Sequence, residues 1–171
     1  MNIYFLVEGQ STEPDVYPAW LSYLVPELQR VYNYDEVEQN NYYLFSSYGI
    51  PYIEKDIINA ANDINSLGKY NYFVICVDSD AATVHQRKIK IRKLLEKNNI
   101  NLTDTSLKII VQNPCIETWF LGNRRVYTRN PQKNRNFIEY SMFYDVSKKD
   151  PELMKKPDKF EGSISSFHFK Y

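Results

Sequence analysis

Residues 72–80 read Tyr-Phe-Val-Ile-Cys-Val-Asp-Ser-Asp, an apolar run that ends in two acidic residues. A continuous apolar run of this kind, without polar alternation, is typical of a parallel strand covered on both faces. Gly68 comes shortly before the run, where it would end a preceding helix. The stretch therefore predicts an interior strand of an α/β sheet, with Asp78 and Asp80 at its carboxyl end.

On both sides of this run, short apolar segments alternate with segments of helical periodicity. Expected strands cover residues 3–7, 42–47, 72–77 and 107–111, and expected helices cover residues 15–30, 54–67, 83–97 and a short stretch from Pro114. The polar, acidic segment 31–42 is expected to be a loop. This alternation predicts an α/β fold with right-handed connections, in which a mostly parallel sheet of about four strands is flanked by helices.

Composition and length narrow the class of protein. The 171 residues are 43% hydrophobic, enough for one core, and only 5 are glycine, which excludes collagen-like and glycine-rich classes. Cys76 and Cys115 show no metal-ligand spacing and make no disulfide framework. There is no signal-peptide pattern and no apolar run of the roughly 20 residues that span a bilayer. We expect a cytoplasmic protein with no membrane partner.

Acidic residues follow three of the expected strands: Glu8, then Asp78 with Asp80, and then Glu117. Because carboxyl ends of parallel strands share one edge of a sheet, these side chains are expected to converge there. Carboxylates without His or Cys suit Mg²⁺ or Mn²⁺, and such a site fits metal-assisted phosphoryl transfer. The alternative is that these residues are ordinary turn residues and helix N-caps.

Three segments resemble a known family. Residues 7–14, Val-Glu-Gly-Gln-Ser-Thr-Glu-Pro, resemble the strand and Glu-Gly that open Toprim domains, in the form found in the RloB-like branch with Tyr17 soon after. Asp78-Ser79-Asp80 resembles the Toprim Asp-x-Asp, and residues 113–121 resemble the Asn-Pro-Cys-x-Glu-x-Trp segment of the same branch. The resemblance covers residues 1–123, which we expect to form a Toprim-like, Rossmannoid catalytic domain. Residues 124–171 are expected to form a basic, partly helical appendage.

The resemblance implies a role for each matching carboxylate. Glu8 would be the Toprim glutamate, a metal ligand or general acid/base, and Asp78 and Asp80 would be the metal-binding pair. Glu117 would be the glutamate of the third motif. Glu13 has two interpretations, as a further metal or supporting carboxylate or as a residue that favours the start of a helix.

Basic residues supply candidate contacts to a nucleic-acid backbone. Arg87 and Lys88 lie in the expected helix 83–97 that follows Asp80, where a solvated charged face is the alternative to phosphate contact. The stretch 118–138 contains five basic residues and no acidic one. Its candidates for binding nucleic acid are Arg124, Arg125 and Arg129.

The net charge of zero is a cancellation between two halves of the chain. Residues 1–80 hold 3 Lys or Arg against 12 Asp or Glu, a net charge of −9, and residues 81–171 carry +9. A basic second half is compatible with nucleic-acid binding, although affinity for the polyanion should be modest.

The resemblance implies a divalent-metal-dependent Toprim nuclease that cleaves DNA or RNA in prokaryotic antiphage defence, with tRNA among the candidate substrates. An ATPase or sensor protein is a candidate partner that would control the activity. The oligomeric state is not predicted, and a homo-oligomer is one candidate. The first alternative is a Toprim-like subunit of a defence complex that binds nucleic acid or a partner without cutting. The second is a metal-dependent phosphotransferase that acts on nucleotides.

Overall fold

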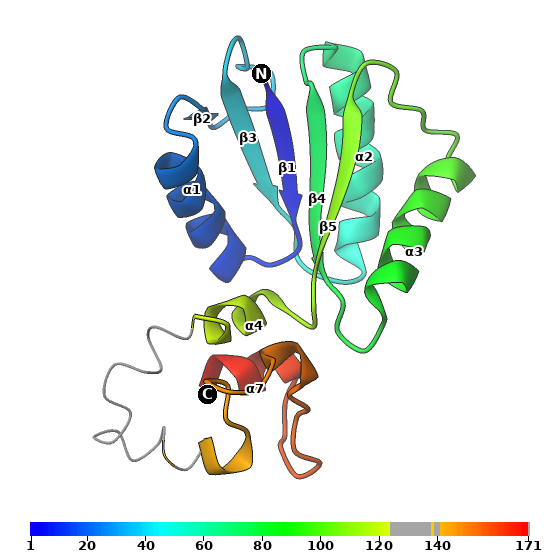
Figure 1. The fold of residues 1–171 in the computed structure, drawn as a ribbon. Helices are drawn as coiled ribbons and strands as arrows, with labels where there is room; N and C mark the ends of the chain where they lie inside the picture. Colours follow the sequence, from blue (N-terminus) through cyan, green and yellow to red (C-terminus); the bar gives the residue numbers. More distant parts are fainter. Residues whose placement is uncertain (124–137, 139–140, 171) are drawn as a thin grey trace. The chain divides into compact units, whose positions relative to one another are not determined.

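The computed structural model describes residues 1–123, 138 and 141–170 (Figure 1). These residues group into two compact units, and each is described by itself. The first unit contains residues 1–77 and 85–111, and the second contains residues 78–84 and those from 112 onward. The expected domain boundary at residue 123 stays a prediction.

A five-stranded parallel sheet organises the chain, in the order β2-β3-β1-β4-β5. Its strands are β1 (Ile3–Val7), β2 (Gln29–Val31), β3 (Asn41–Ser46), β4 (Tyr72–Asp78) and β5 (Ser106–Gln112). In the register, Val7 of β1 lies opposite Ser46 of β3 on one side and Cys76 of β4 on the other. The α/β fold class is therefore confirmed, as a Rossmann-like arrangement with one strand more than expected.

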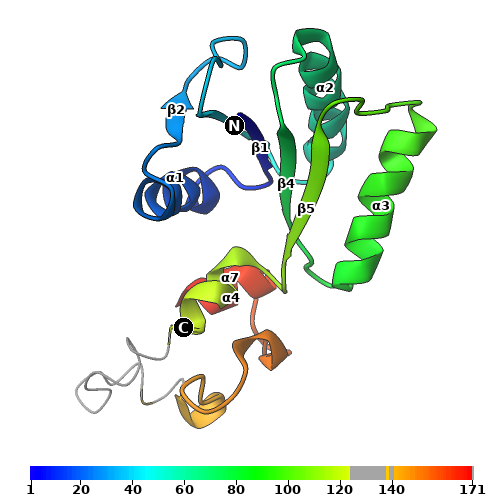
Figure 2. The same ribbon diagram turned by 45° about the horizontal axis from the view of Figure 1, so that its top comes forward.

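Helices cover the two faces of the sheet unequally (Figures 1 and 2). The main helices are α1 (Thr12–Leu24), α2 (Tyr52–Leu67), α3 (Val84–Lys97), α4 (Ile116–Leu121) and α7 (Ile164–Lys170), and the 3₁₀ helix η2 covers Pro151–Leu153. Tyr17 of α1 contacts Phe5, whereas the neighbouring Tyr4 belongs to the core formed with α2 and α3. Because successive strand residues face opposite ways, α1 lies on one face and α2 and α3 lie on the other.

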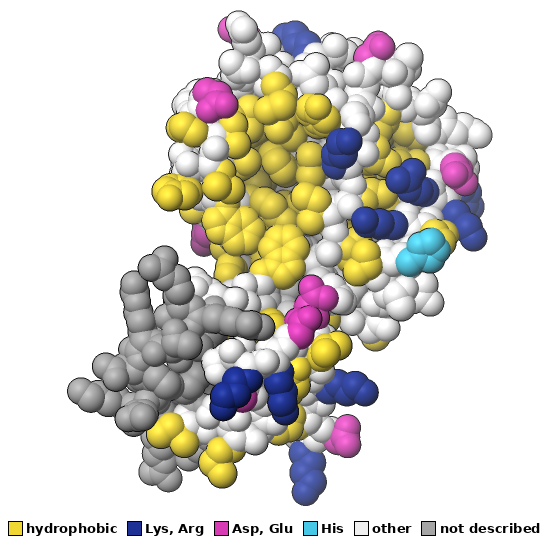
Figure 3. Space-filling view, viewed as in Figure 1, with side chains coloured by type: hydrophobic (Ala, Val, Ile, Leu, Met, Phe, Trp, Pro, Cys, Tyr) yellow, Lys and Arg dark blue, Asp and Glu magenta, His cyan; other side chains and the backbone are white. Residues whose placement is uncertain are grey.

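The core under α2 and α3 is fully apolar at its centre. Leu6, Ile64 and Phe73 are completely inaccessible to solvent, and the Tyr4 ring packs edge-on against Phe73. Gly68 ends α2 in the left-handed conformation at φ 66°, as the sequence predicts. On the opposite face, apolar side chains gather on the surface beside α1 (Figure 3).

The first helix is shorter than its periodicity predicts. We expected a helix over residues 15–30, but α1 ends at Leu24 and β2 begins at Gln29. Pro26 explains the end, since a proline has no N–H and disfavours helical backbone in the residue before it. Leu28 matches the apolar stripe of the helix, but it is buried in the segment that follows the helix. The apolar pattern therefore predicted a helix longer than the one that forms.

The second unit has a small core of its own. Leu121 of α4 and Phe167 of α7 are buried together with Val146 and Met154. The described part of the expected appendage thus contains helical segments that pack in this unit. Within the described ranges of the chain, no helix has the length and apolarity that crossing a membrane requires.

Candidate functional site

Neighbouring strands hold the turn at Glu8 and Gly9. The Glu8 N–H donates to the Cys76 carbonyl at 3.1 Å, and the Gly49 N–H donates to the Glu8 carbonyl at 3.1 Å. The Ser46 hydroxyl donates to the Gly9 carbonyl at 2.6 Å. The Glu-Gly pair therefore follows the central strand in a backbone fixed by the strands on both sides of β1.

Glu13 folds back onto this turn from the first turn of α1. Its carboxylate accepts a hydrogen bond from the Gly9 N–H at 3.2 Å, and the residue is only 4% exposed. A Cβ atom at Gly9 would lie 2.2 Å from Glu13 Oε2, closer than two such atoms can approach. The close approach supports Glu13 as a residue that positions the turn, while its role as a metal ligand stays a prediction.

In the second unit, the backbone joins the Asp78-Ser79-Asp80 segment to the Asn113–Ile116 segment. The Ser79 N–H donates to the Gln112 carbonyl at 2.8 Å, and the Asp80 N–H donates to the Pro114 carbonyl at 3.0 Å. The Ser79 hydroxyl also donates to the Asn113 side-chain oxygen at 2.9 Å. Two motifs more than 30 residues apart in the sequence are thus one structural piece.

Side chains strengthen this junction. Asp78 Oδ1 accepts a hydrogen bond from the Ile116 N–H, 3.2 Å away at the start of α4. An acidic side chain is favourable there because the first N–H groups of a helix lack partners within the helix. Asp80 is exposed and has a left-handed backbone at φ 51°, a conformation that Asp tolerates better than most residues.

Glu117 is half-buried beside a polar cluster that no sequence motif indicates. The cluster consists of Cys115, Thr118 and His168, which are 0%, 1% and 2% exposed. Thr118 Oγ1 lies 2.9 Å from His168 Nδ1 and 3.2 Å from Cys115 Sγ, and His168 Nε2 lies 3.3 Å from the Met154 carbonyl oxygen. No local pattern could reveal this contact, because His168 follows Thr118 by 50 residues.

Burial controls the protonation of this cluster. Desolvation lowers the pKa of His168, although the Met154 carbonyl and the nearby Glu117 charge partly oppose the shift. Desolvation also raises the pKa of the Cys115 thiol to about 12, although hydrogen bonds with Thr118 act in the opposite direction and lower it. Cys76, in the first unit, has its pKa raised to about 12 by burial as well. Both cysteines are free thiols, protonated at neutral pH.

The carboxylates predicted to bind metal are divided between the units: Glu8 and Glu13 belong to the first, and Asp78, Asp80 and Glu117 belong to the second. Among the residues that the structure describes, no group of three or more His, Cys, Asp or Glu residues is arranged to hold a metal ion. The chemistry of the donor set, all carboxylate, is nevertheless that of an Mg²⁺ or Mn²⁺ site. Their convergence on a metal stays a prediction.

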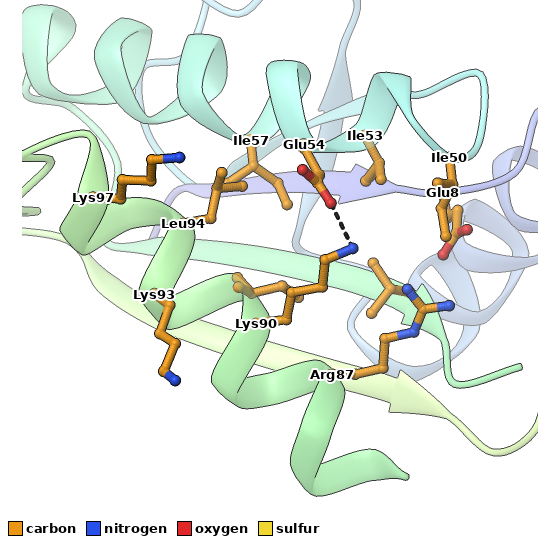
Figure 4. Close-up of a pocket in the computed structure, with 12 residues that line it drawn as sticks. Glu8, Ile50, Ile53, Glu54, Ile57, Arg87, Lys90, Lys93, Leu94 and Lys97 are labelled. Atoms are coloured by element: carbon orange, nitrogen blue, oxygen red, sulfur yellow. Dashed lines mark ion pairs between the residues drawn. The ribbon is translucent and has the colours of Figure 1, made fainter. Parts of the chain in front are cut away.

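Of the predicted nucleic-acid contacts, Arg87 lines a cavity of about 230 Å³ in the first unit, together with Glu8 (Figure 4). Lys88, the next residue of α3, is exposed and does not line this cavity. Arg124, Arg125 and Arg129 lie outside the described residues. No sequence pattern predicts the cavity, because the two helices that form its walls are separate in the sequence.

Comparisons of the chain with family models, with curated proteins and with solved structures found no match.

Proposed function

We propose that the protein is a divalent-metal-dependent nuclease of the Toprim type, in which Glu8, Asp78, Asp80 and Glu117 act on a phosphodiester of DNA or RNA. In the hydrolysis, a water oxygen bonds to phosphorus while the bond from phosphorus to the leaving sugar oxygen breaks. The water loses a proton and the leaving oxygen gains one. Mg²⁺ or Mn²⁺, held by these carboxylates, would supply positive charge at the phosphate.

The observation that carries the proposal is the junction between the two acidic motifs of the second unit. Ser79, Asp80 and Ile116 donate backbone hydrogen bonds across it, and one of the acceptors is the Asp78 carboxylate itself. Proteins fix catalytic side chains in this way, with each one supported by a rigid backbone and by hydrogen bonds. These contacts fix the backbone that carries Asp78 and Asp80, and this supports the proposal.

The sheet gives a second line of support. Glu8 follows β1 and Asp78 ends β4, and these strands are neighbours near the middle of a parallel sheet. In parallel α/β sheets, ligand sites form at the carboxyl ends of strands. A role in antiphage defence under the control of an ATPase or sensor rests on the resemblance alone.

The test is cleavage of labelled single-stranded and duplex DNA, RNA and tRNA by the wild type and by a Glu8→Gln/Asp78→Asn variant, each with MgCl₂, MnCl₂ or EDTA. We expect metal-dependent cleavage by the wild type and a loss of at least a thousandfold in the variant, since carboxylates that hold a catalytic metal are essential. The Asp78→Asn substitution keeps an oxygen that can accept the Ile116 N–H, so the variant should retain its circular dichroism spectrum.

The matched control is Glu96→Gln/Asp104→Asn, which removes the same charge from two exposed positions and should cleave like the wild type. Cleavage by the site variant at the wild-type rate would refute the site assignment. A wild type that binds nucleic acid and cuts none of these substrates would refute the proposal in favour of a non-cleaving subunit.

A further inference from the structure

A cavity of about 230 Å³ lies between α2 and α3 of the first unit (Figure 4). Its apolar wall is entirely aliphatic and consists of Ile50, Ile53, Ile57, Val77, Ile91 and Leu94. Ile53, Ile57, Val77 and Ile91 are between 1% and 6% exposed, whereas Ile50 is 50% exposed. The floor of the cavity is therefore apolar and buried. Its rim, at Ile50, is open to solvent, so a ligand can enter there.

Charged side chains border this apolar floor, and cations outnumber carboxylates among them. The cations are Arg87, Lys90, Lys93 and Lys97, all from α3, and the carboxylates are Glu8 and Glu54. Lys90 and Glu54 form an ion pair at 2.6 Å across the cavity, with 56% and 41% of their side chains exposed. In Figure 4, Arg87 and Glu8 lie at one end of the cavity and Lys97 lies at the other.

This combination defines the ligand by its chemistry. Ligand pockets for drug-sized molecules span roughly 300–1,000 Å³, so this cavity suits a single small fragment of a larger molecule. The excess of cations favours an anion, and the aliphatic floor requires a compact apolar body. Beyond its ion pair with Lys90, the Glu54 carboxylate has further lone pairs that can accept a hydrogen bond from the amino group of a base, which an aliphatic acid does not have.

We propose that this cavity holds one unstacked nucleotide of a single-stranded nucleic acid, with the base against the aliphatic floor and the phosphate beside Arg87. The proposal rests on the proposed nuclease function, because Glu8 lies at the same end of the cavity as Arg87. A base removed from its stack is commonly held between apolar side chains, and its phosphate is bound by a guanidinium group. Substrate would then be recognised one nucleotide at a time, next to the carboxylate expected to take part in cleavage.

The test is binding in EDTA, measured by calorimetry with the full chain, so that no cleavage contributes. The probes are adenosine monophosphate, adenosine, inorganic phosphate, decanoate and a single-stranded pentanucleotide. We expect adenosine monophosphate to bind at least tenfold more tightly than adenosine or phosphate alone, and the pentanucleotide to displace it. Arg87→Gln should weaken both nucleotide ligands about tenfold, since hydrogen bonds to charged groups contribute strongly.

Arg92→Gln is the matched control, because it removes the same charge from the same helix at an exposed position that does not line the cavity. Leu94→Trp provides a second variant, which fills the half-buried rim and should abolish nucleotide binding while the melting temperature stays near that of the wild type.

Several results would overturn the proposal: decanoate binding more tightly than adenosine monophosphate, equal effects of Arg87→Gln and Arg92→Gln, or mononucleotide binding that the pentanucleotide does not displace. Failure here with intact metal-dependent cleavage refutes the cavity assignment alone. Nucleotide binding without cleavage refutes the proposed nuclease and not the nucleotide site.

Discussion

Gly9 leaves room for the carboxylate of Glu13. It is not one of the glycines with a positive φ, so its backbone conformation is open to other residues. What a side chain would disturb is the buried Glu13 carboxylate, whose Oε1 accepts the Gly9 N–H. The Glu-Gly pair and Glu13 are therefore one arrangement, in which the glycine gives the carboxylate room to bind the turn.

Gly9→Ala should lower the free energy of unfolding by about 1–3 kcal/mol, the usual cost of leaving a buried polar group without its hydrogen bond. The new Cβ would displace Glu13 Oε2, which lies 2.2 Å from its position. In a Glu13→Ala background the same substitution should cost much less, because the carboxylate is already absent. Urea denaturation of the four chains measures this coupling. Additive effects would show that Gly9 acts independently of Glu13.

Asp80 separates the requirements of the fold from those of the proposed chemistry. Its φ of 51° is in the left-handed region, which Gly and Asn accept readily and Ala does not. Asp80→Ala should therefore cost about 1 kcal/mol of stability. Asp80→Asn and Asp80→Gly should be nearly neutral in urea denaturation. All three should lose metal-dependent cleavage, because all remove the carboxylate. Wild-type cleavage by Asp80→Asn would exclude Asp80 from the catalytic set.

At the scale of elements, the sequence predicts long periodic segments well and short edge segments poorly. The structure has α2 at Tyr52–Leu67 and α3 at Val84–Lys97, each within two residues of its expected range, since each carries a clear apolar stripe and α2 ends at Gly68. The three-residue strand β2 was missed because it has one exposed and two half-buried residues, and so shows no apolar signal. It occupies the edge of the sheet, where strands need less apolar character.

Helix α7 is joined to α4 through a buried histidine, and this contact should make stability depend on pH. The pKa of His168 is lowered by burial, so the folded chain prefers the neutral ring. As pH falls below the ordinary histidine value of about 6.5, the unfolded chain gains a proton that the folded chain resists. The histidine's contribution to stability is therefore complete above that pH and declines below it.

Urea denaturation between pH 7.5 and 5.5 should show this loss in the wild type and a smaller loss in His168→Gln. The other histidine, His85, is exposed and provides the control, so His85→Gln should follow the wild type. His168→Gln should also lower stability by about 1–3 kcal/mol at pH 7.5, because it disturbs a buried hydrogen-bond cluster. Parallel pH profiles for all three chains would mean that the buried ring does not control the effect.

At the scale of the whole molecule, the sequence predicts the strands and the residues at their ends better than it predicts which distant side chains meet. Four of the five strands, and the acidic residues that follow three of them, can be recognised from apolar runs and their ends. The aliphatic cavity and the Thr118–His168 contact arise when distant segments pack, and a single sequence shows no sign of such pairing. Arg87 is an example. The sequence predicts a phosphate contact for both Arg87 and its neighbour Lys88, but in the structure only Arg87 of these two lines the cavity.

The net charge of zero predicts how the binding of single-stranded nucleic acid depends on salt concentration. A total charge of zero gives the chain little general attraction for a polyanion, so affinity should depend on a few local cations. Each phosphate contact to a single strand contributes about −0.7 to the slope of log K against log salt concentration. Arg87→Gln should therefore make the slope shallower by about 0.7, as expected for the loss of one contact. Arg92→Gln changes the net charge equally without altering the cavity, so it should leave the slope unchanged.

Fluorescence anisotropy with a labelled pentanucleotide between 50 and 300 mM KCl would measure the slopes for the wild type and the two variants. Equal changes in both variants would assign the binding to overall charge and not to the cavity.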